Sequence, residues 1–238
     1  MTARGLVEFL GPFPHETTCR VIDWVKEEVK RQIGNTGSEP GKRSLLNTLH
    51  YLFESQNHGL AKDALESVVT LSFRGMTLTP IDCTVLSHAI GHCDTIKHLN
   101  LWDCHIQCEG IQRLGPGLPK CQELRLGGNK LEDSGVILVS AALRNPECKI
   151  QKLELNNVGL TDSGVEDLVS TLSTNSSLTE LDLGRNWLTD LSVPAFRRLI
   201  LTLPSLERIW LFGNQFSETG KKELESLREV RPGLRVYL

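Results

Sequence analysis

Aromatic residues are scarce in this sequence, making up 5% of 238 residues, and there are only 2 methionines and 2 tyrosines. A hydrophobic core of this composition must be built mainly from aliphatic side chains, and leucine is visibly the dominant one. A leucine-dominated sequence with few large rings indicates an internal repeat.

Long apolar runs and an excess of one charge are also missing. No segment approaches the roughly 18 apolar residues of a membrane-spanning helix, and the short apolar run at residues 6–13 is broken by Glu8, Gly11 and Pro12, unlike a secretory signal. The 26 basic and 29 acidic residues give a net charge of -3. We therefore expect neither a membrane nor, by bulk charge, a nucleic acid as a partner.

Paired cysteine spacings are absent as well. The seven cysteines are an odd number scattered along the chain. Because disulfides belong to exported proteins and no export signal is present, reduced thiols in the cytoplasm fit this pattern best.

One pattern, L-x-x-L-x-L-x-x-N-x-L with looser variants, recurs along the chain. Its second leucine position falls, 25 to 29 residues apart, at Leu71, Leu99, Leu124, Leu153, Leu181 and Ile209. A further step of 25 residues reaches Leu234, which predicts a last, truncated strand at residues 234–236. A fixed period of this length is typical of stacked repeats.

Each repeat predicts one strand followed by one helix. Within the L-x-L core the leucines alternate with other residues, as in a strand with one buried face. Residues 161–172 then place apolar side chains at the i, i+3, i+4 and i+7 positions of a helix. Since one unit cannot bury its leucines alone, we expect an α/β fold, a right-handed solenoid with a parallel concave sheet and outer helices over residues 67–238.

The asparagine position of the pattern predicts a second source of stability, hydrogen bonds from a buried side-chain amide. A buried amide there can satisfy backbone groups that the sheet leaves unpaired in the following loop. Asn129, Asn186 and Asn214 can do this, Cys104 only weakly, and Val158 not at all. We therefore expect a discontinuous series of amide bonds.

Residues 1–66 lack the period. They contain one helical stripe that includes Cys19, Ile22, Val25 and Val29, and another at residues 45–53, separated by the turn-rich residues 33–41. Two stripes are too little for an independent core, so this segment is predicted to pack on the first repeat as a helical cap.

The repeats, with phrases such as the one running from Leu181 to Asp190, resemble the leucine-rich repeats of the ribonuclease-inhibitor type. Residues 21–26 and 46–57 are similar to the helical domain that precedes the repeats in NOD-like receptors, particularly the pyrin-containing, inflammasome-forming branch. The resemblance implies the carboxy-terminal portion of a cytoplasmic innate-immune receptor. In that family the repeats take part in ligand sensing, in restraint of the nucleotide-binding module or in self-association.

Two functions follow from this resemblance. The first is a protein-recognition and regulatory module, either ligand-sensing or autoinhibitory, of a NOD-like receptor. The alternative is a free-standing inhibitor or scaffold resembling ribonuclease inhibitor. The chain contains no G-x-x-x-x-G-K-[ST] phosphate loop, and neither a pyrin nor a caspase-recruitment domain fits its length, so we expect it alone neither to hydrolyse ATP nor to signal.

Metal and enzyme chemistry are not expected. The densest group of ligand-type residues is His92, Cys93, His98, Cys104, His105 and Cys108. The repeat pattern points these side chains in different directions, which argues against a zinc site. No spacing indicates a nucleophile with its base, and we expect no cofactor.

Function is instead expected at the outward positions of the strands. We predict a partner-binding concave face, the partner being a protein or the receptor's own nucleotide-binding module. Trp102 lies near one end of this face, and Trp210 and Phe212 lie near the other. Between them we expect an acidic strip of Glu154, Glu180 and Asp182, with Arg125 nearby. Exposed aromatic residues beside charge are common in interface hot spots. The competing interpretation is an ordinary solvated sheet face whose aromatics pack on their neighbours.

Overall fold

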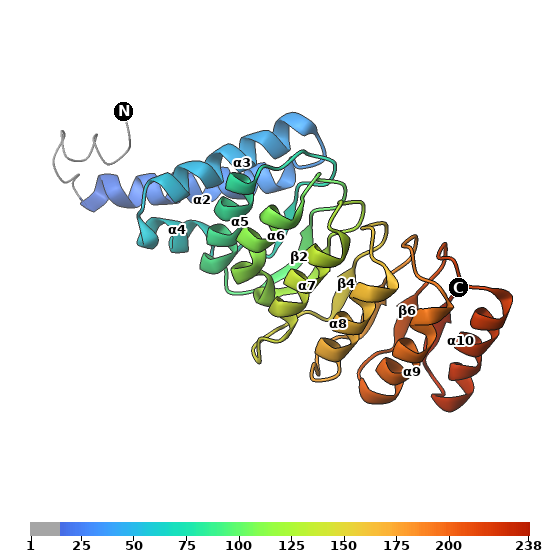
Figure 1. Ribbon diagram of the computed structural model, residues 1–238. Helices are drawn as coiled ribbons and strands as arrows, with labels where there is room; N and C mark the ends of the chain where they lie inside the picture. Colours follow the sequence, from blue (N-terminus) through green and yellow to red (C-terminus); the bar gives the residue numbers. More distant parts are fainter. Residues whose placement is uncertain (1–14) are drawn as a thin grey trace.

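A computed structural model describes residues 15–238, without the side chains of residues 15–19 and 21 (Figure 1). The described residues begin with three helices, α2 (His15–Gly34), α3 (Glu39–Glu54) and α4 (His58–Leu65). The expected absence of a secretory signal and the side chain of Cys19 lie outside the described residues. In the part of the chain that is described, no helix is both long and apolar enough to cross a membrane.

Seven short strands follow and form one parallel sheet in the order of the sequence. They are β1 (Thr70–Ser72), β2 (Ile96–Asn100), β3 (Cys121–Arg125), β4 (Lys152–Glu154), β5 (Glu180–Asp182), β6 (Arg208–Trp210) and β7 (Arg235–Tyr237). The repeat position marked by Leu71 pairs in turn with Leu99, Leu124, Leu153, Leu181 and Ile209. The predicted period is thereby confirmed as one strand per repeat.

The last strand corrects one detail of that prediction. Ile209 pairs with Val236, not with Leu234, so the repeat position of the last strand lies two residues later than expected. The strand itself spans residues 235–237 and not 234–236. The hydrophobic pattern alone did not decide this, because Leu234 and Val236 are both buried.

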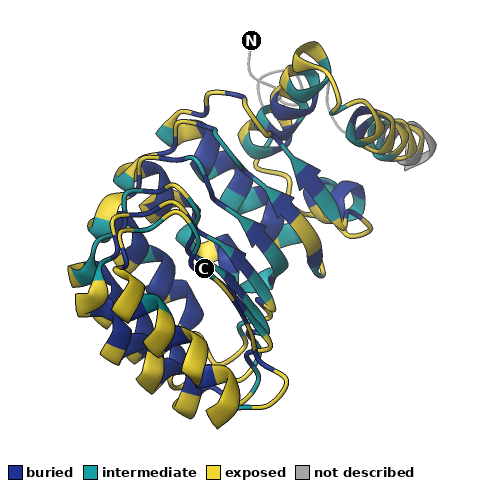
Figure 2. Ribbon diagram, turned by 90° about the vertical axis from the view of Figure 1, so that its right-hand side faces the viewer, coloured by how far each residue is buried: buried dark blue, intermediate teal, exposed yellow. Residues whose placement is uncertain are grey.

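A helix on the other side of the sheet follows each of the first six strands (Figure 2). They are α5 (Pro80–His92), α6 (Cys108–Leu114), α7 (Glu132–Leu143), α8 (Asp162–Leu172), α9 (Val193–Thr202) and α10 (Glu218–Val230), with 3-10 turns at Gly115–Lys120 and Asp190–Ser192. The α/β solenoid with a parallel sheet and outer helices is confirmed.

Side-chain caps explain where several helices begin. Thr79 accepts a hydrogen bond from the backbone N–H of Asp82, whose carboxylate accepts one from the N–H of Thr79, so α5 starts with a capping box. Thr161 caps α8 and Ser217 caps α10 through their hydroxyl groups. Each cap satisfies backbone donors that the first helical turn leaves unpaired.

One continuous apolar core runs from Val29 in α2 to Val236 in β7. The apolar stripe predicted for α8 is buried in full. Burial of a single leucine of this kind contributes about 1.5–3 kcal/mol. The stacking of repeats therefore supplies most of the stability of the molecule.

The asparagine prediction is also confirmed. The Asn129 side-chain amide donates to the carbonyl oxygens of Leu101 and Leu126, and its oxygen accepts from the N–H groups of Cys104 and Ile106. Asn186 and Asn214 form equivalent bonds two and three repeats further along. The Cys104 thiol donates only weak hydrogen bonds, to the carbonyl oxygens of Phe73 and Trp102.

The helices before the first strand pack on the first repeat. Helices α3 and α4 both contact α5, and His50 on α3 lies 2.7 Å from the carboxylate of Asp82 on α5. Helix α4 was not expected from the sequence, because its eight residues carry too short an apolar stripe to stand out.

Candidate functional site

The outward side chains of the sheet form rows that cross the strands. Register places His98, Glu123, Lys152, Glu180, Arg208 and Arg235 in one row. The next row contains Asn100, Arg125, Glu154, Asp182, Trp210 and Tyr237. Because neighbouring parallel strands lie about 4.8 Å apart, members of a row are close enough to interact directly.

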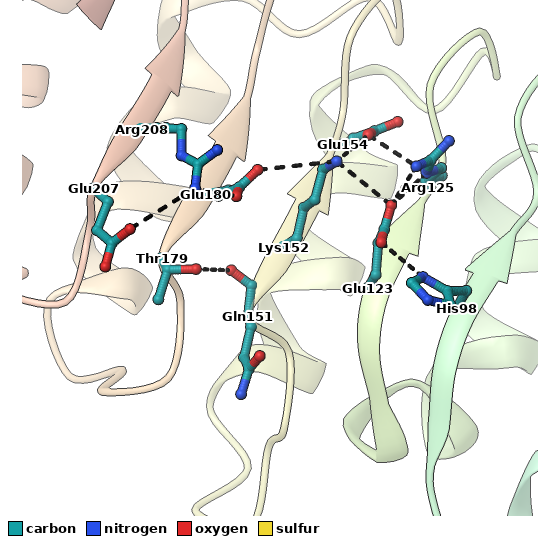
Figure 3. A network of polar contacts seen from close by, with 10 residues as sticks. All are labelled: His98, Glu123, Arg125, Gln151, Lys152, Glu154, Thr179, Glu180, Glu207 and Arg208. Atoms are coloured by element: carbon teal, nitrogen blue, oxygen red, sulfur yellow. Dashed lines mark hydrogen bonds and ion pairs between the residues drawn. The ribbon is translucent and has the colours of Figure 1, made fainter. Parts of the chain in front are cut away.

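From Glu123 to Arg208 the first row alternates in charge, and it forms a network of ion pairs (Figure 3). His98 Nδ1 lies 2.7 Å from Glu123, and Lys152 Nζ lies 3.5 Å from Glu123. Lys152 also lies 3.2 Å from Glu154 and 3.9 Å from Glu180. At the far end Arg208 lies 3.1 Å from Glu180, so cations and carboxylates follow one another across the face.

This network corrects the expectation of an acidic strip. Glu154 is paired with Lys152 and with Arg125, and Glu180 with Lys152 and Arg208. Sequence reasoning treated the carboxylates separately from the cations at the same repeat position. Reading that position across successive repeats would have predicted the alternation.

The pKa values of Glu123 and Asp182 are shifted in opposite directions. Burial alone would raise the pKa of Glu123, but hydrogen bonds from Arg125 and His98 outweigh it and hold the pKa below its usual value. Burial raises the pKa of Asp182, and the neighbouring negative charge of Glu154 raises it further. Asp182 accepts a hydrogen bond from the N–H of Gly184 at 2.9 Å. The second row thus holds one carboxylate whose charge is poorly compensated.

Two of the predicted aromatic residues cover glycines of the neighbouring repeat. A Cβ atom on Gly127 would lie 2.9 Å from the Trp102 ring, and one on Gly184 would lie 2.9 Å from the Phe212 ring. The guanidinium carbon of Arg74 lies 4.7 Å from the centre of the Trp102 ring. Both rings are therefore partly buried against their own neighbours, as in the competing interpretation.

The third predicted aromatic residue also has a neighbour. Trp210 stacks on Tyr237, with ring centres 5.2 Å apart and an interplanar angle of 9°. Tyr237 was missed because the expected register of the last strand did not place it opposite Trp210. Four strand spacings separate β2 from β6, about 19 Å, so Trp102 and Trp210 do not form one cluster.

A hollow of about 160 Å³ lies at the Trp102 end of the face. Three of the predicted residues, Trp102, Arg125 and Glu154, line it together with Arg74 and Asn100. The other four predicted residues, Glu180, Asp182, Trp210 and Phe212, lie outside it. The hollow offers an aromatic surface, cations and an anion within one small area.

A larger hollow of about 660 Å³ lies along the loops that follow the strands. Trp187, which is 61% exposed, lies at its edge. Loop backbone and polar side chains, including Lys130, Glu132 and Asp133, form much of its wall. Trp187 is more exposed than Trp102, Trp210 or Phe212, which are all half-buried.

Four buried cysteines of the repeats are poor nucleophiles. Burial raises the pKa of Cys83, Cys93 and Cys121 to about 12 and that of Cys104 to about 11. The thiolate is the reactive form of cysteine, so these side chains stay protonated and act as small apolar groups.

Comparisons with known proteins agree with the repeat architecture. A family model described as "Leucine Rich repeat" matches residues 122–140 and 174–195. Over 159 residues the chain is 30% identical to "NLR family member X1" of Rattus norvegicus, covering 66% of this chain and 16% of that protein.

Two further relatives carry the same type of name. The chain is 33% identical over 153 residues to "NACHT, LRR and PYD domains-containing protein 12" of Homo sapiens, covering 60% of this chain and 14% of that protein. It is 34% identical over 188 residues to "NACHT, LRR and PYD domains-containing protein 14" of Mus musculus, covering 66% of this chain and 18% of that protein. The chain thus matches less than a fifth of the length of each of these relatives.

Proposed function

The chain carries a leucine-rich-repeat region of the NOD-like-receptor type, and we propose that it is a protein-recognition and regulatory module of a cytoplasmic innate-immune receptor. Residues 1–66 would then correspond to the helical segment that joins the nucleotide-binding module to the repeats. The alternative of a free-standing inhibitor is not favoured, because the relatives are NOD-like receptors. We propose a binding role, not a catalytic one.

The hollow beside Trp102 is the observation that favours the concave face as the binding surface. Arg125 and Glu154 come from adjacent strands and meet there 3.5 Å apart, next to the Trp102 ring. An aromatic ring beside charged groups that can exchange partners is the chemistry of an interface hot spot. A partner side chain that enters the hollow would stack on Trp102 and pair with Arg125 or Glu154.

Charge complementarity on this face demands a partner of mixed charge. The row from Glu123 to Arg208 alternates in sign, so a uniformly basic or acidic surface would meet like charges at every second strand. A protein surface that alternates in the opposite sense would fit, and it would bind in one register only. We therefore infer a specific protein partner, the nucleotide-binding module being the first candidate, with self-association as a further mode.

Arginine substitutions in the hollow of the concave face and on the outer helices test this proposal. The chain would be titrated with the purified nucleotide-binding module of the human protein 12 relative, with the dissociation constant measured by biolayer interferometry. Arg125→Ala should weaken binding at least tenfold, whereas Arg197→Ala, an equally simple loss of one exposed arginine on α9, should leave it unchanged. Loss of binding with Arg197→Ala alone would move the interface to the outer helices, and equal binding by all three proteins would reject the hollow.

A further inference from the structure

Three histidines from two helices converge where the first helices meet the repeats. His58 is the first residue of α4, and His88 and His92 lie one helical turn apart on α5. One ring nitrogen from each lies within 4.8 Å of the other two. Residues four apart on a helix share a face, so α5 presents His88 and His92 together toward α4.

The spacing of these nitrogens suits a metal ion. His58 Nδ1 lies 3.4 Å from His92 Nε2. Two imidazole nitrogens that bind one tetrahedral zinc ion at about 2.0–2.1 Å are about 3.3–3.4 Å apart. That pair is already at ligand distance, and a nitrogen of His88 lies within 4.8 Å of both.

Contacts around the rings hold two of them in place. His92 Nδ1 donates to the backbone carbonyl oxygen of His88 at 2.9 Å, so the lone pair of His92 is on Nε2, the atom that faces His58. A ligand histidine in metalloproteins is commonly oriented in this way by a backbone carbonyl. The Phe53 ring packs edge-on against His88, with ring centres 5.1 Å apart.

Burial lowers the pKa of His88, and the neighbouring His92 and His58 lower it further. His92 lies in the last turn of α5, where the helix dipole favours positive charge.

We propose that His58, His88 and His92 form a binding site for a divalent transition metal ion of the class that imidazole prefers, with zinc as its representative. Three neutral nitrogen ligands leave the fourth tetrahedral position for water or a partner's side chain. Bound metal would join α4 to α5 and so fasten the preceding helices to the first repeat. This site differs from the cysteine and histidine run at residues 92–108, of which it includes His92 alone.

Zinc titration of the chelator-treated, reduced chain tests the proposal. Calorimetry should show one saturable site of micromolar affinity or better. His88→Ala and His58→Ala should each weaken it at least tenfold, because one of three ligands is lost. His58 is exposed, so its replacement leaves the fold intact. His105→Asn is the matched control, because His105 is an exposed histidine outside the cluster with a positive φ that asparagine tolerates.

Two further measurements separate this site from metal held by cysteine. Zinc should raise the thermal unfolding midpoint of the wild type and of His105→Asn, but not that of His58→Ala. The spectrum of the cobalt-loaded chain should lack a thiolate-to-metal charge-transfer band. The proposal is overturned if that band appears, if zinc binds the histidine variants as tightly as the wild type, or if no saturable binding is found at millimolar zinc.

Discussion

The carboxylate of Asp162 accepts two hydrogen bonds from Thr189, 2.9 Å from its backbone N–H and 2.7 Å from its hydroxyl group. Asp162 begins α8, and Thr189 lies at the start of the next helical turn, one repeat later. Asp133 binds Thr161 in the same way, and Asp190 binds Ser217. A chain of aspartates thus links the helix starts of four successive repeats on the convex side.

Removal of one carboxylate from this chain of aspartates should weaken the fold. Burial alone would raise the pKa of Asp162, but hydrogen bonds from Ser192 and Thr189 hold it below its usual value. Asp162→Asn replaces one acceptor oxygen by a donor that faces a hydroxyl group, and should lower the free energy of unfolding by about 1–3 kcal/mol. Urea denaturation at neutral pH measures this loss.

The pH dependence of Asp162 has a defined sign. A carboxyl whose pKa is lower in the folded state stabilises the fold above its unfolded pKa of about 3.9, and that stability disappears as pH falls through the folded pKa. The difference between wild type and Asp162→Asn should therefore shrink on acidification below about pH 4. Asp167→Asn, an exposed change on the same helix, should have little effect at either pH.

The buried side-chain amide of Asn129 supports a second prediction. Asn129→Ala removes five hydrogen bonds to backbone groups and leaves buried N–H and carbonyl groups of two repeats unpaired. We expect a loss of about 3 kcal/mol or more in the free energy of unfolding, since each unpaired buried group costs about 1–3 kcal/mol. Gln215→Ala removes an exposed amide and is the control. A loss below 1 kcal/mol, on the order of a single exposed contact, would contradict the role assigned to Asn129.

The architecture could be predicted from the sequence because the repeat fixes it. Leucines at one position of each unit must face inward together, and parallel register follows once the units stack. The pattern also identified Asn129 and Cys104 as strong and weak members of the amide series.

Features that join different repeats were harder to predict. The pairing of Glu154 with Arg125 depends on side-chain length and direction, and the contact of Trp102 with Gly127 depends on the space above a glycine. His58 and His88 lie 30 residues apart on helices of different character, one of them too short to be recognised. The repeat period carries no information about that pair, because His58 lies before the first strand.

Lys152 at the centre of the concave face supports a third prediction. Burial would lower its pKa, but hydrogen bonding and attraction to Glu154 and Glu123 outweigh this and raise it. Lys152→Met leaves Glu123, Glu154 and Glu180 without their shared cation, and should cost about 1–3 kcal/mol in the free energy of unfolding at pH 7. The loss should diminish at high pH, as pH rises through the folded pKa of Lys152, which lies above the usual lysine value of about 10.4. Lys130→Met, at a lysine that is 79% exposed, should leave stability unchanged at both pH values.

Asp182 should behave in the opposite way from Asp162. Burial, followed by the charge of Glu154, raises the pKa of Asp182, so its ionisation opposes folding at neutral pH. Asp182→Asn keeps an oxygen that can accept the hydrogen bond from Gly184 but removes the charge. We therefore expect the variant to unfold at a higher urea concentration than the wild type at pH 7. As pH falls through the folded pKa of Asp182, the wild-type carboxyl becomes neutral and the two proteins should converge in stability. A variant less stable than the wild type at pH 7 would contradict this prediction. It would mean that a cation on this face needs the ionised carboxylate, so that Asp182 belongs to the network of ion pairs.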